Sequence, residues 1–560
     1  MGNSAPDRKS VASAGLLRGY PRDWLRPDIV AGLTAAAVVV PKAMAYATIA
    51  GLPVQVGLYT AFIPMVIYAL TGSSRPLSVS TTTTIAILTA AALGLAVPGG
   101  EAGQLATAAG TLAILVGLVL VLANVLRLGF VANFISEPVL VGFKSGIGFV
   151  IVVDQLPKLL GIHIDKAGFF RDIASITHHL PEASLATIVV SVAVFVLIFG
   201  LERFLPRSPA PLVAVGLAIA ASALFGLQQA GVAVVGEVPR GLPAFGWPDL
   251  GLVRQLWPAA LGIALMSFTE SIAAGRAFAA AEEPRPVPNR ELLALGLANA
   301  GGGVFGAMPA GGGTSQTAVN RRAGAKSQMA ELVTAAGALA TLLVLAPLIG
   351  LMPKAALAAV VIATSLGLIQ PGEFVDIRKV RTNEFRWGVV AFAGVLVLGT
   401  LQGILVAVIV SLVSLAHQAF RTPVYTLGRK AGTSVFRQLS SQHPDDETWP
   451  GLLMLRIEGR VFFANVQRIG DQVWPLVEQA KPKVVLLDCR AIFDLEYTAL
   501  KMLGEAEQSL RRDGVELWLA GLNPSVFAVV ERSKLGKSLG HERMFHNLQA
   551  AVERFQDRTP

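Results

Sequence analysis

The segments Gly72-Ser-Ser-Arg-Pro-Leu-Ser-Val-Ser-Thr-Thr-Thr-Thr84 and Met308-Pro-Ala-Gly-Gly-Gly-Thr-Ser-Gln-Thr317 interrupt the apolar runs of this 560-residue chain at matching places. Each contains a proline, Pro76 or Pro309, that predicts extended chain before a new apolar helix begins. Interrupted segments at corresponding positions in two halves of a chain are a sequence sign of a binding site within a membrane. These two segments therefore direct the interpretation of the whole chain.

Fourteen apolar segments surround these interruptions, seven before the polar stretch 228–256 and seven after it. Nine have membrane-spanning length, and five are shorter or are interrupted by glycine or proline. The long segments are 28–48, 54–71, 104–126, 183–204, 209–227, 257–280, 328–350, 384–401 and 403–420, and the short ones are 81–97, 135–156, 291–308, 315–325 and 353–370. The pattern predicts a polytopic α-helical membrane protein with repeats at 28–227 and 257–421. Because each repeat has an odd number of segments, the second repeat must be inverted relative to the first.

The charge distribution supports a membrane domain. Hydrophobic residues make up 53% of the chain and charged residues only 15%, against about 25% charged residues in an average soluble protein. This composition excludes a disordered chain, a coiled coil, a collagen-like rod and a disulfide-stapled secreted domain. Residues 434–560 hold 16 Lys and Arg and 17 Asp and Glu, so the whole positive surplus lies in the apolar part.

The short loops of the apolar part give its orientation. Loops assigned to the inside carry 19 Lys and Arg residues, against 6 in loops assigned to the outside. This asymmetry predicts a multi-pass protein of the inner (cytoplasmic) membrane, with a cytoplasmic N-terminal arm at 1–27 and a cytoplasmic C-terminus. Nucleic acid is not expected as a partner, because the positive charge is spread over short loops instead of one soluble face.

The C-terminal part has soluble composition. After a predicted linker at 422–451, the residues 452–560 alternate strand-like runs such as Leu452–Ile457 and Val484–Asp488 with predicted helices, which indicates a small α/β domain. No nucleophile–base pair, metal quartet or pair of catalytic carboxylates is recognisable there. We therefore expect neither an enzyme, nor a cofactor, nor a metal site. His178 and His179 fall in a predicted loop without other close ligands, and Cys489 is expected to be a buried apolar side chain.

The two interrupted segments suggest an anion site. A helix that begins inside the membrane presents unpaired backbone N–H groups and a partial positive charge, and two such ends facing each other would bind an anion. Hydroxyl groups at the two segments come from Ser78, Ser80, Thr81, Ser315 and Thr317. The alternative is that these small residues only allow close helix packing.

Two ionisable residues lie within apolar runs. Glu270 follows Leu265-Met-Ser-Phe-Thr269 and is a candidate to bind a coupling cation, H⁺ or Na⁺. Lys42 lies inside the first span and is the natural partner for the Glu270 carboxylate. Alternatively, Lys42 offers its charge to a substrate anion or extends toward the membrane surface. Lys144 and Asp154 are interpreted as structural.

Several motifs together resemble the signatures of the SulP anion transporters. They are Asp28-Ile-Val-Ala-Gly-Leu-Thr34, Pro41-Lys-Ala-Met-Ala-Tyr-Ala47, Glu270-Ser-Ile-Ala-Ala-Gly-Arg-Ala-Phe-Ala279 and Ser315-Gln-Thr-Ala-Val-Asn-Arg-Arg-Ala-Gly-Ala325. The tail, with Leu487-Asp-Cys489 and Asp494-Leu-Glu-Tyr-Thr-Ala-Leu500, resembles a STAS domain at 452–560. The resemblance covers nearly the whole chain beyond about residue 20.

The resemblance implies a transport domain at 28–421 with a seven-plus-seven inverted repeat, a homodimer and elevator-type movement. It implies a small inorganic or carboxylate anion such as sulfate, bicarbonate, chloride or a dicarboxylate, with proton or sodium coupling. It also places the substrate at Ser80, Thr81, Ser315 and Gln316, with Tyr46 and Glu270 nearby.

This chain departs from the family pattern at two positions. Lys42 stands where glutamine is common, and Gln316 stands where arginine is frequent, so Lys42 is a candidate to replace the missing arginine charge. In the STAS tail, Thr498 occupies the position of a phosphorylated hydroxyl and is a candidate site for a cytoplasmic regulator; a helix-capping or packing threonine is the alternative.

Two other functions fit parts of the pattern. A nucleobase permease can share this inverted-repeat architecture, and a membrane-tethered signalling protein can carry the same tail. Arg75, the Ser315 segment and the STAS resemblance argue against the permease.

Overall fold

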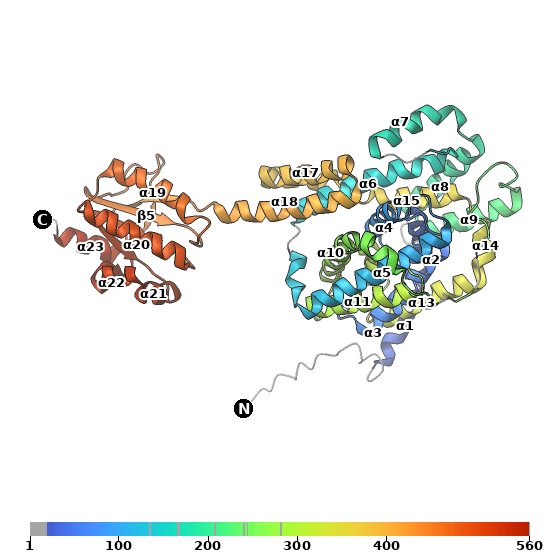
Figure 1. Ribbon diagram of the computed structural model, residues 1–560, viewed down its shortest axis with the longest axis horizontal. Coiled ribbons are helices and arrows are strands. Elements are labelled where there is room, and N and C mark those ends of the chain that lie inside the picture. Colours follow the sequence, from blue (N-terminus) through green and yellow to red (C-terminus); the bar gives the residue numbers. More distant parts are fainter. Residues whose placement is uncertain are drawn as a thin grey trace. The chain divides into compact units, whose positions relative to one another are not determined.

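The computed structural model describes residues 20–133, 136–164, 168–205, 209–238, 241–242, 245–280 and 283–558. The chain forms two units, Met1–Leu412 and Val413–Pro560. The first is almost entirely helical and the second is an α/β unit (Figure 1). Most of the predicted N-terminal arm, residues 1–19, lies outside the described residues.

The helices of the first half follow the predicted apolar segments closely. They are α1 (Arg22–Ile49), α2 (Val54–Thr60), α3 (Ile63–Thr71), α4 (Thr83–Ala96), α5 (Ala102–Val125), α6 (Glu137–Leu160), α8 (Leu185–Phe204) and α9 (Ala210–Phe225). Helix α1 begins six residues before the predicted span, so residues 22–27 of the predicted arm are helical. The helix can begin before the first apolar residue because its first turn is exposed, so that its polar side chains are solvated.

The second half repeats this order of elements. It contains α10 (Val253–Phe278), α11 (Pro288–Val304), α12 (Thr314–Arg322), α13 (Met329–Ala340), α14 (Ala346–Gly350), α15 (Lys354–Leu366), α17 (Thr382–Leu398) and α18 (Thr400–Phe420). A π-helical turn at Thr341–Leu345 joins α13 to α14. Among the described residues, nine helical stretches are long and apolar enough to cross a membrane. The polytopic helical fold is thus confirmed, with seven predicted segments present in each half.

Two helices were not expected. α7 (Phe169–His179) and α16 (Pro371–Val380) form in stretches that the sequence pattern assigned to loops. The histidine pair His178 and His179 therefore ends α7 and does not lie in a loop. α7 is amphipathic, with only Ile176 buried, and a helix of this kind has too few apolar residues to be recognised as a membrane span.

Glycines allow neighbouring helices to pack closely at places where the sequence suggested that a helix is interrupted. The segment 135–156 was grouped with those that are shorter or interrupted by glycine or proline, but α6 is a continuous helix of 24 residues. A Cβ atom on Gly142 would lie 2.0 Å from the Gly388 carbonyl oxygen of α17. α6 and α17 pack side by side in Figure 1 for this reason, as do α5 and α11. These glycines are contact positions within intact helices.

Two short strands pair inside the helical unit. β1 (Val79–Ser80) and β2 (Gly311–Gly312) are antiparallel, with Val79 opposite Gly312 and Ser80 opposite Gly311. This pairing satisfies backbone groups of irregular chain at membrane depth, where water is absent. Each strand leads directly into a helix, β1 into α4 and β2 into α12.

The second unit contains a six-stranded sheet in the order β4-β3-β5-β6-β7-β8. Its strands are β3 (Val424–Arg429), β4 (Phe436–Gln438), β5 (Leu452–Ile457), β6 (Val484–Asp488), β7 (Glu516–Ala520) and β8 (Met544–Phe545). The four strands from β5 to β8 are parallel, and β3 is antiparallel to both of its neighbours. The predicted linker at 422–451 was therefore wrong in part, because it contains β3 and β4. Their short alternating pattern carries no continuous apolar run that would reveal them.

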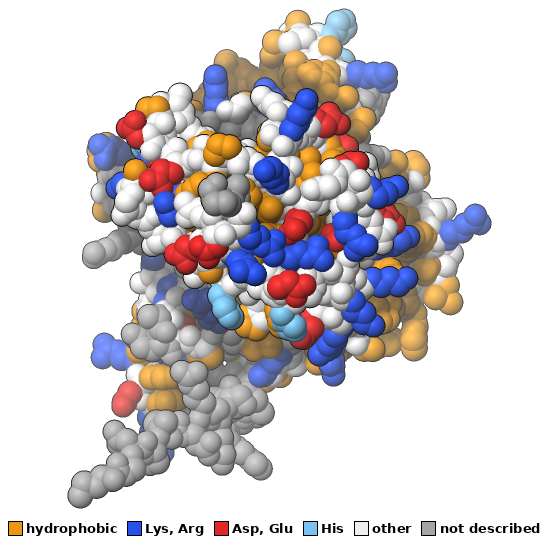
Figure 2. Space-filling model, turned by 90° about the vertical axis from the view of Figure 1, so that its left-hand side faces the viewer, with side chains coloured by type: hydrophobic (Ala, Val, Ile, Leu, Met, Phe, Trp, Pro, Cys, Tyr) orange, Lys and Arg blue, Asp and Glu red, His pale blue; other side chains and the backbone are white. Residues whose placement is uncertain are grey.

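Helices cover both faces of this sheet. α19 (Val466–Ala480), α20 (Tyr497–Arg512), α21 (Pro524–Glu531) and α22 (Lys534–Leu539) enclose the core that contains Leu455 and Leu487. α23 (Leu548–Arg558) packs on the opposite face against Trp518. Cys489 is buried, as expected. On the face shown in Figure 2, Lys and Arg side chains alternate with Asp and Glu side chains.

The outer surface of the helical unit is apolar. Large hydrophobic side chains are exposed along α5, α8, α17 and α18, for example Leu122, Val196, Val397 and Ile409. A soluble protein rarely exposes so much apolar surface, whereas a lipid bilayer would cover it. The protein is therefore a multi-pass membrane protein.

Candidate anion-binding site

Both interrupted segments form helix starts inside the helical unit. Thr82 is the N-cap of α4, and its hydroxyl accepts a hydrogen bond from the Ile85 N–H at 3.2 Å. Gly313 is the N-cap of α12, and no side chain caps that helix. The first N–H groups of α12 thus have no capping side chain, and they carry the partial positive charge of a helix N-terminus.

A cavity of about 500 Å³ opens beside these two helix starts. Seven helices contribute polar side chains to its wall. These side chains are Lys42 and Tyr46 (α1), Thr82, Thr83 and Thr84 (start of α4), Lys144 (α6), Glu202 (α8), Glu270 (α10), Thr314, Ser315 and Gln316 (α12) and Thr364 (α15). The cavity brings together five of the seven site residues proposed from the sequence: Tyr46, Lys42, Glu270, Ser315 and Gln316.

The other two proposed residues, Ser80 and Thr81, do not line this cavity. Both are fully buried behind Gln316. The Ser80 hydroxyl donates a hydrogen bond to Gln316 Oε1 at 2.8 Å, and Gln316 Nε2 donates to the Thr81 carbonyl oxygen at 3.3 Å. In this conformation β1 therefore positions Gln316, while the wall of the cavity is made by the three threonines that follow.

Glu270 is held by α4 and α6. Its two oxygens accept hydrogen bonds from the hydroxyls of Thr82 and Thr84, each at 3.0 Å. The Lys144 ammonium lies 3.7 Å from Glu270 Oε1. The carboxylate is thus compensated in charge and in hydrogen bonding, although only 5% of Glu270 is exposed.

The expected pairing of Lys42 with Glu270 was wrong. Lys42 Nζ instead donates a hydrogen bond to Ser315 Oγ at 3.2 Å, at the start of α12. Lys144 takes the role that the sequence suggested for Lys42. The two lysines lie in similar apolar runs, and the sequence cannot show which one the packing of α6 against α4 brings to Glu270.

Lys42 nevertheless lies at the start of α12, next to one of the two interrupted segments. Its bond to Ser315 puts the ammonium beside Gln316, the position where the family pattern has arginine. A Lys ammonium and an Arg guanidinium differ in geometry, but both supply positive charge at a helix N-terminus. The replacement of the arginine charge by Lys42 stays a prediction.

Sequence reasoning missed several cavity residues. Lys144 was interpreted as structural, and Glu202 was hidden in a polar helix end before Arg203. The threonine run Thr82-Thr-Thr84 belongs to the first interrupted segment, which was the sequence signal for these three residues. The formal charges of Lys42, Lys144, Glu202 and Glu270 cancel.

Metal binding has no candidate constellation in the parts of the chain that the structure describes. No group of three or more His, Cys, Asp or Glu side chains is suitably arranged there.

In the second unit, Thr498 is exposed in the first turn of α20. Glu496, not Thr498, is the N-cap residue of α20, and the Thr498 side chain lies outside the core; its role as a regulatory site stays a prediction.

Comparison with known proteins agrees with this fold. Residues 25–391 match the model of the sulfate permease family, and residues 443–551 match the STAS domain. A probable sulfate transporter of Mycobacterium tuberculosis H37Rv is 33% identical over 545 residues, covering 97% of each chain. The chloroplastic sulfate transporter 4.1 of Arabidopsis thaliana is 30% identical over 553 residues, covering 95% of this chain and 80% of that protein.

Solved structures share the fold at lower identity. The murine anion transporter Slc26a9 in the inward-facing state has a TM-score of 0.90 at 21% identity, covering 99% of this chain and 96% of that chain. The transmembrane domain of the cyanobacterial bicarbonate transporter BicA has a TM-score of 0.60 at 24% identity, covering 69% of this chain and 98% of that chain. The seven-plus-seven order of helices is consistent with these folds. The chain belongs to the sulfate permease family, whose members are transporters and not enzymes, and it carries a STAS domain at its C-terminal end.

Proposed function

We propose that this protein is a secondary active transporter of a small anion of the sulfate, bicarbonate or dicarboxylate class. One observation carries the proposal. The Lys42 ammonium donates a hydrogen bond to the Ser315 hydroxyl at the N-terminus of α12, which no side chain caps, and both residues line the polar cavity. An ammonium, a hydroxyl and free backbone N–H groups together form a donor set suited to an oxyanion. Relatives named as sulfate transporters make sulfate the first anion to test.

The bound anion would draw donors from three sources. The N–H groups at the start of α12 and the hydroxyls of Ser315 and Thr83 would contact its oxygens, and Lys42 would supply charge. Gln316 would present its amide from the position that Ser80 and Thr81 give it. Tyr46 would border the anion from α1.

In this proposal, Lys144 couples anion binding to cation binding. An anion in the cavity competes with Glu270 for the Lys144 ammonium, which lies 3.7 Å from the carboxylate. A Glu270 carboxylate that loses part of this compensation gains affinity for a cation, either H⁺ or Na⁺, because a buried unpaired charge is costly. Anion and cation therefore bind with positive linkage, which is the requirement for symport.

We propose an inverted repeat that moves in elevator fashion, a homodimer, and both termini on the cytoplasmic side of the inner membrane. The exposed Thr498 hydroxyl would then be accessible to a cytoplasmic regulator.

The experiment that tests this function is uptake into proteoliposomes of labelled sulfate, bicarbonate, chloride and succinate, each measured separately, with the other three unlabelled anions as competitors. Accumulation driven by a proton or sodium gradient, and abolished by at least one of these anions, is the expected result. Glu270→Gln should uncouple accumulation from the gradient. Gradient-driven accumulation that survives in Glu270→Gln would contradict the coupling role of Glu270, and absence of transport for all four anions would contradict the function.

A further inference from the structure

Glu331 is a buried carboxyl group that the proposed transport cycle does not use. It lies in the first turn of α13, and none of its surface is exposed. Its Oε1 accepts a hydrogen bond from the Val79 N–H of β1 at 2.7 Å. Its Oε2 is buried and accepts no hydrogen bond of ordinary geometry from the described residues. The Ser78 hydroxyl lies near the carboxyl group but donates to Gln316 Oε1 at 3.4 Å. An ionised carboxylate in this place would leave one charged oxygen uncompensated.

The described surroundings of Glu331 provide no ion pair. No lysine, arginine or histidine of the described chain lies within ion-pair distance of its carboxyl group. The titratable groups near the start of α13 are Asp28 on α1, Tyr68 on α3, and two basic residues. The basic residues are Lys326, in the turn before α13, and Arg75, whose carbonyl oxygen accepts a hydrogen bond from Gln328, and neither forms an ion pair with Glu331. Farther along α1, Lys42 and Tyr46 face the transport cavity, and Arg22, Asp23 and Arg26 are exposed.

Asp28 accepts the hydrogen bonds of the backbone N–H groups that precede α13. Its Oδ1 accepts hydrogen bonds from the Lys326 and Ser327 N–H groups at 2.6 and 3.1 Å. The positive end of α13 is therefore partly neutralised by Asp28 before Glu331 can benefit from it. The acceptor oxygen of Gln328, one turn earlier than Glu331, also has no partner within the described structure.

Glu291 provides an internal comparison. It is equally buried, but Glu291 Oε1 accepts hydrogen bonds from the Ser73 N–H at 2.8 Å and from the Ser73 hydroxyl at 2.6 Å. Glu291 Oε2 accepts one from the Tyr68 hydroxyl at 2.8 Å. The donors around Glu291 favour its charged form and oppose the effect of burial, whereas a buried carboxyl with an open oxygen and no cation has less to stabilise its charge and more readily takes up a proton.

We propose that Glu331 is a proton-binding site separate from Glu270, and that its proton holds β1 in place for anion binding. The equilibrium is a simple one, in which the neutral acid releases H⁺ to give the carboxylate and no other bond changes. Val79 is bonded to Glu331, is paired with Gly312 in β2, and precedes Ser80, which positions Gln316. A charge on Glu331 would draw water or donors into this buried place and displace β1, and Gln316 with it.

This inference rests on the proposed anion site, and its test is binding of labelled sulfate to the purified full-length protein as a function of pH. In the wild-type protein, sulfate affinity should fall by up to about tenfold per pH unit above the pH at which Glu331 ionises, since one linked proton changes a binding constant by that factor. Glu331→Gln imitates the neutral acid and should bind sulfate with wild-type affinity at low pH and without this fall. Glu291→Gln, the matched control, should keep the wild-type pH dependence, and Glu270→Gln should keep the part that Glu331 contributes. A wild-type pH dependence in Glu331→Gln would overturn the proposal.

Infrared spectroscopy of the same protein tests the proton directly. The wild-type protein at neutral pH should show the carbonyl-stretch band of a buried carboxylic acid that disappears at high pH and is missing in Glu331→Gln. This band does not depend on sulfate binding, so it also decides the case in which the anion site itself is wrong. If Glu331→Gln does not fold, Glu331→Asp should retain a shifted band. A wild-type spectrum without any protonated carboxylic acid at neutral pH would contradict the proposal.

Discussion

At the scale of single residues, the Lys144–Glu270 pair is the part of the site that sequence reasoning assigned to the wrong lysine. Lys144→Met would leave Glu270 buried beside two threonines without a cation. We expect this change to cost about 3 kcal/mol of stability, because an unpaired buried charge remains. The double variant Lys144→Met/Glu270→Gln should lose less than the sum of the single changes.

A double-mutant cycle in purified protein, with thermal unfolding as the measurement, checks this pair. The matched control is the cycle of Lys42→Met with Glu270→Gln. Since Lys42 bonds Ser315 and not Glu270, the control cycle should be additive. A coupling energy for Lys42 that equals or exceeds the one for Lys144 would show that the sequence-based pairing was right after all.

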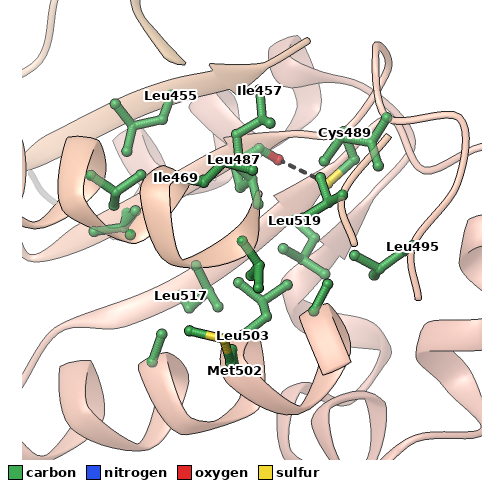
Figure 3. Close-up of a pocket in the computed structure, with 18 of the residues that line it drawn as sticks. Leu455, Ile457, Ile469, Leu487, Cys489, Leu495, Met502, Leu503, Leu517 and Leu519 are labelled. Carbon is green, nitrogen blue, oxygen red and sulfur yellow. Dashed lines mark hydrogen bonds between the residues drawn. The ribbon is translucent and has the colours of Figure 1, made fainter. Parts of the chain in front are cut away.

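Cys489 offers a second test at this scale. It is the one cysteine of the chain, and it lines an apolar cavity of about 130 Å³ in the core of the second unit (Figure 3). Burial raises the pKa of the Cys489 thiol, and the neighbouring Asp488 charge acts in the same direction. Because the thiolate is the reactive form, we expect almost no alkylation by a maleimide at neutral pH in the folded protein and complete alkylation after denaturation. Rapid labelling of the native protein would contradict the described core.

At the scale of elements, glycine contacts set how closely the helices pack. Gly142→Ala should destabilise the protein by about 1–3 kcal/mol, because the new Cβ would meet the Gly388 carbonyl and the helices α6 and α17 must separate. Gly200→Ala on α8 is the control, since nothing lies within 4 Å of the added atom. Alanine there should be neutral or slightly stabilising. Thermal unfolding in detergent measures both, and equal effects of the two changes would refute this packing.

The stability of the second unit depends on pH through Asp488, at the end of strand β6. Asp488 is fully buried and is bound by Arg456 on β5 at 2.8 Å and by Arg490 at 3.0 Å. Burial alone would raise the pKa of Asp488, but the hydrogen bonds from Arg490 and Arg456 outweigh burial and hold it below its usual value. The stabilisation is therefore complete above the usual aspartate pKa of about 3.9 and is lost as the pH falls through the lower folded-state pKa.

Asp488→Asn should remove this acid dependence and destabilise the second unit at neutral pH by about 3 kcal/mol. Hydrogen exchange of β5, β6 and β7 in the intact protein, corrected for intrinsic rates, measures both effects. Unchanged protection at neutral pH in Asp488→Asn would show that the ion pairs do not stabilise the sheet.

The helices and strands also show which parts of the fold can be predicted from the sequence. The helical spans could be predicted because apolar runs of spanning length have few alternatives, and α1, α5 and α10 lie close to their predicted positions. The two helix starts at Thr82 and Gly313 were found from composition and proline position. β3 and β4 were missed because strand pairing depends on distant residues. The partners of Lys42 and Glu270 were missed because they are fixed only when α1, α4 and α6 pack together.

At the scale of the whole molecule, the two units make the role of the STAS domain testable. A deletion that removes it must begin between the end of α18 at Phe420 and the start of β3 at Val424, because β3 belongs to the sheet. We expect the truncated protein to bind labelled sulfate with an affinity close to that of the full-length protein. Complete loss of binding in a truncated protein that remains folded would favour the signalling alternative.

The central claim is that an anion binds at the start of α12 with positive charge supplied by Lys42. The most direct measurement is equilibrium binding of labelled sulfate to purified Lys42→Gln and to Lys42→Gln/Gln316→Arg. The single change should weaken binding by about 10- to 100-fold, the effect of losing one charge-assisted hydrogen bond. The double variant should recover much of the affinity, because it returns the positive charge to the neighbouring position. Wild-type affinity in Lys42→Gln would contradict the account.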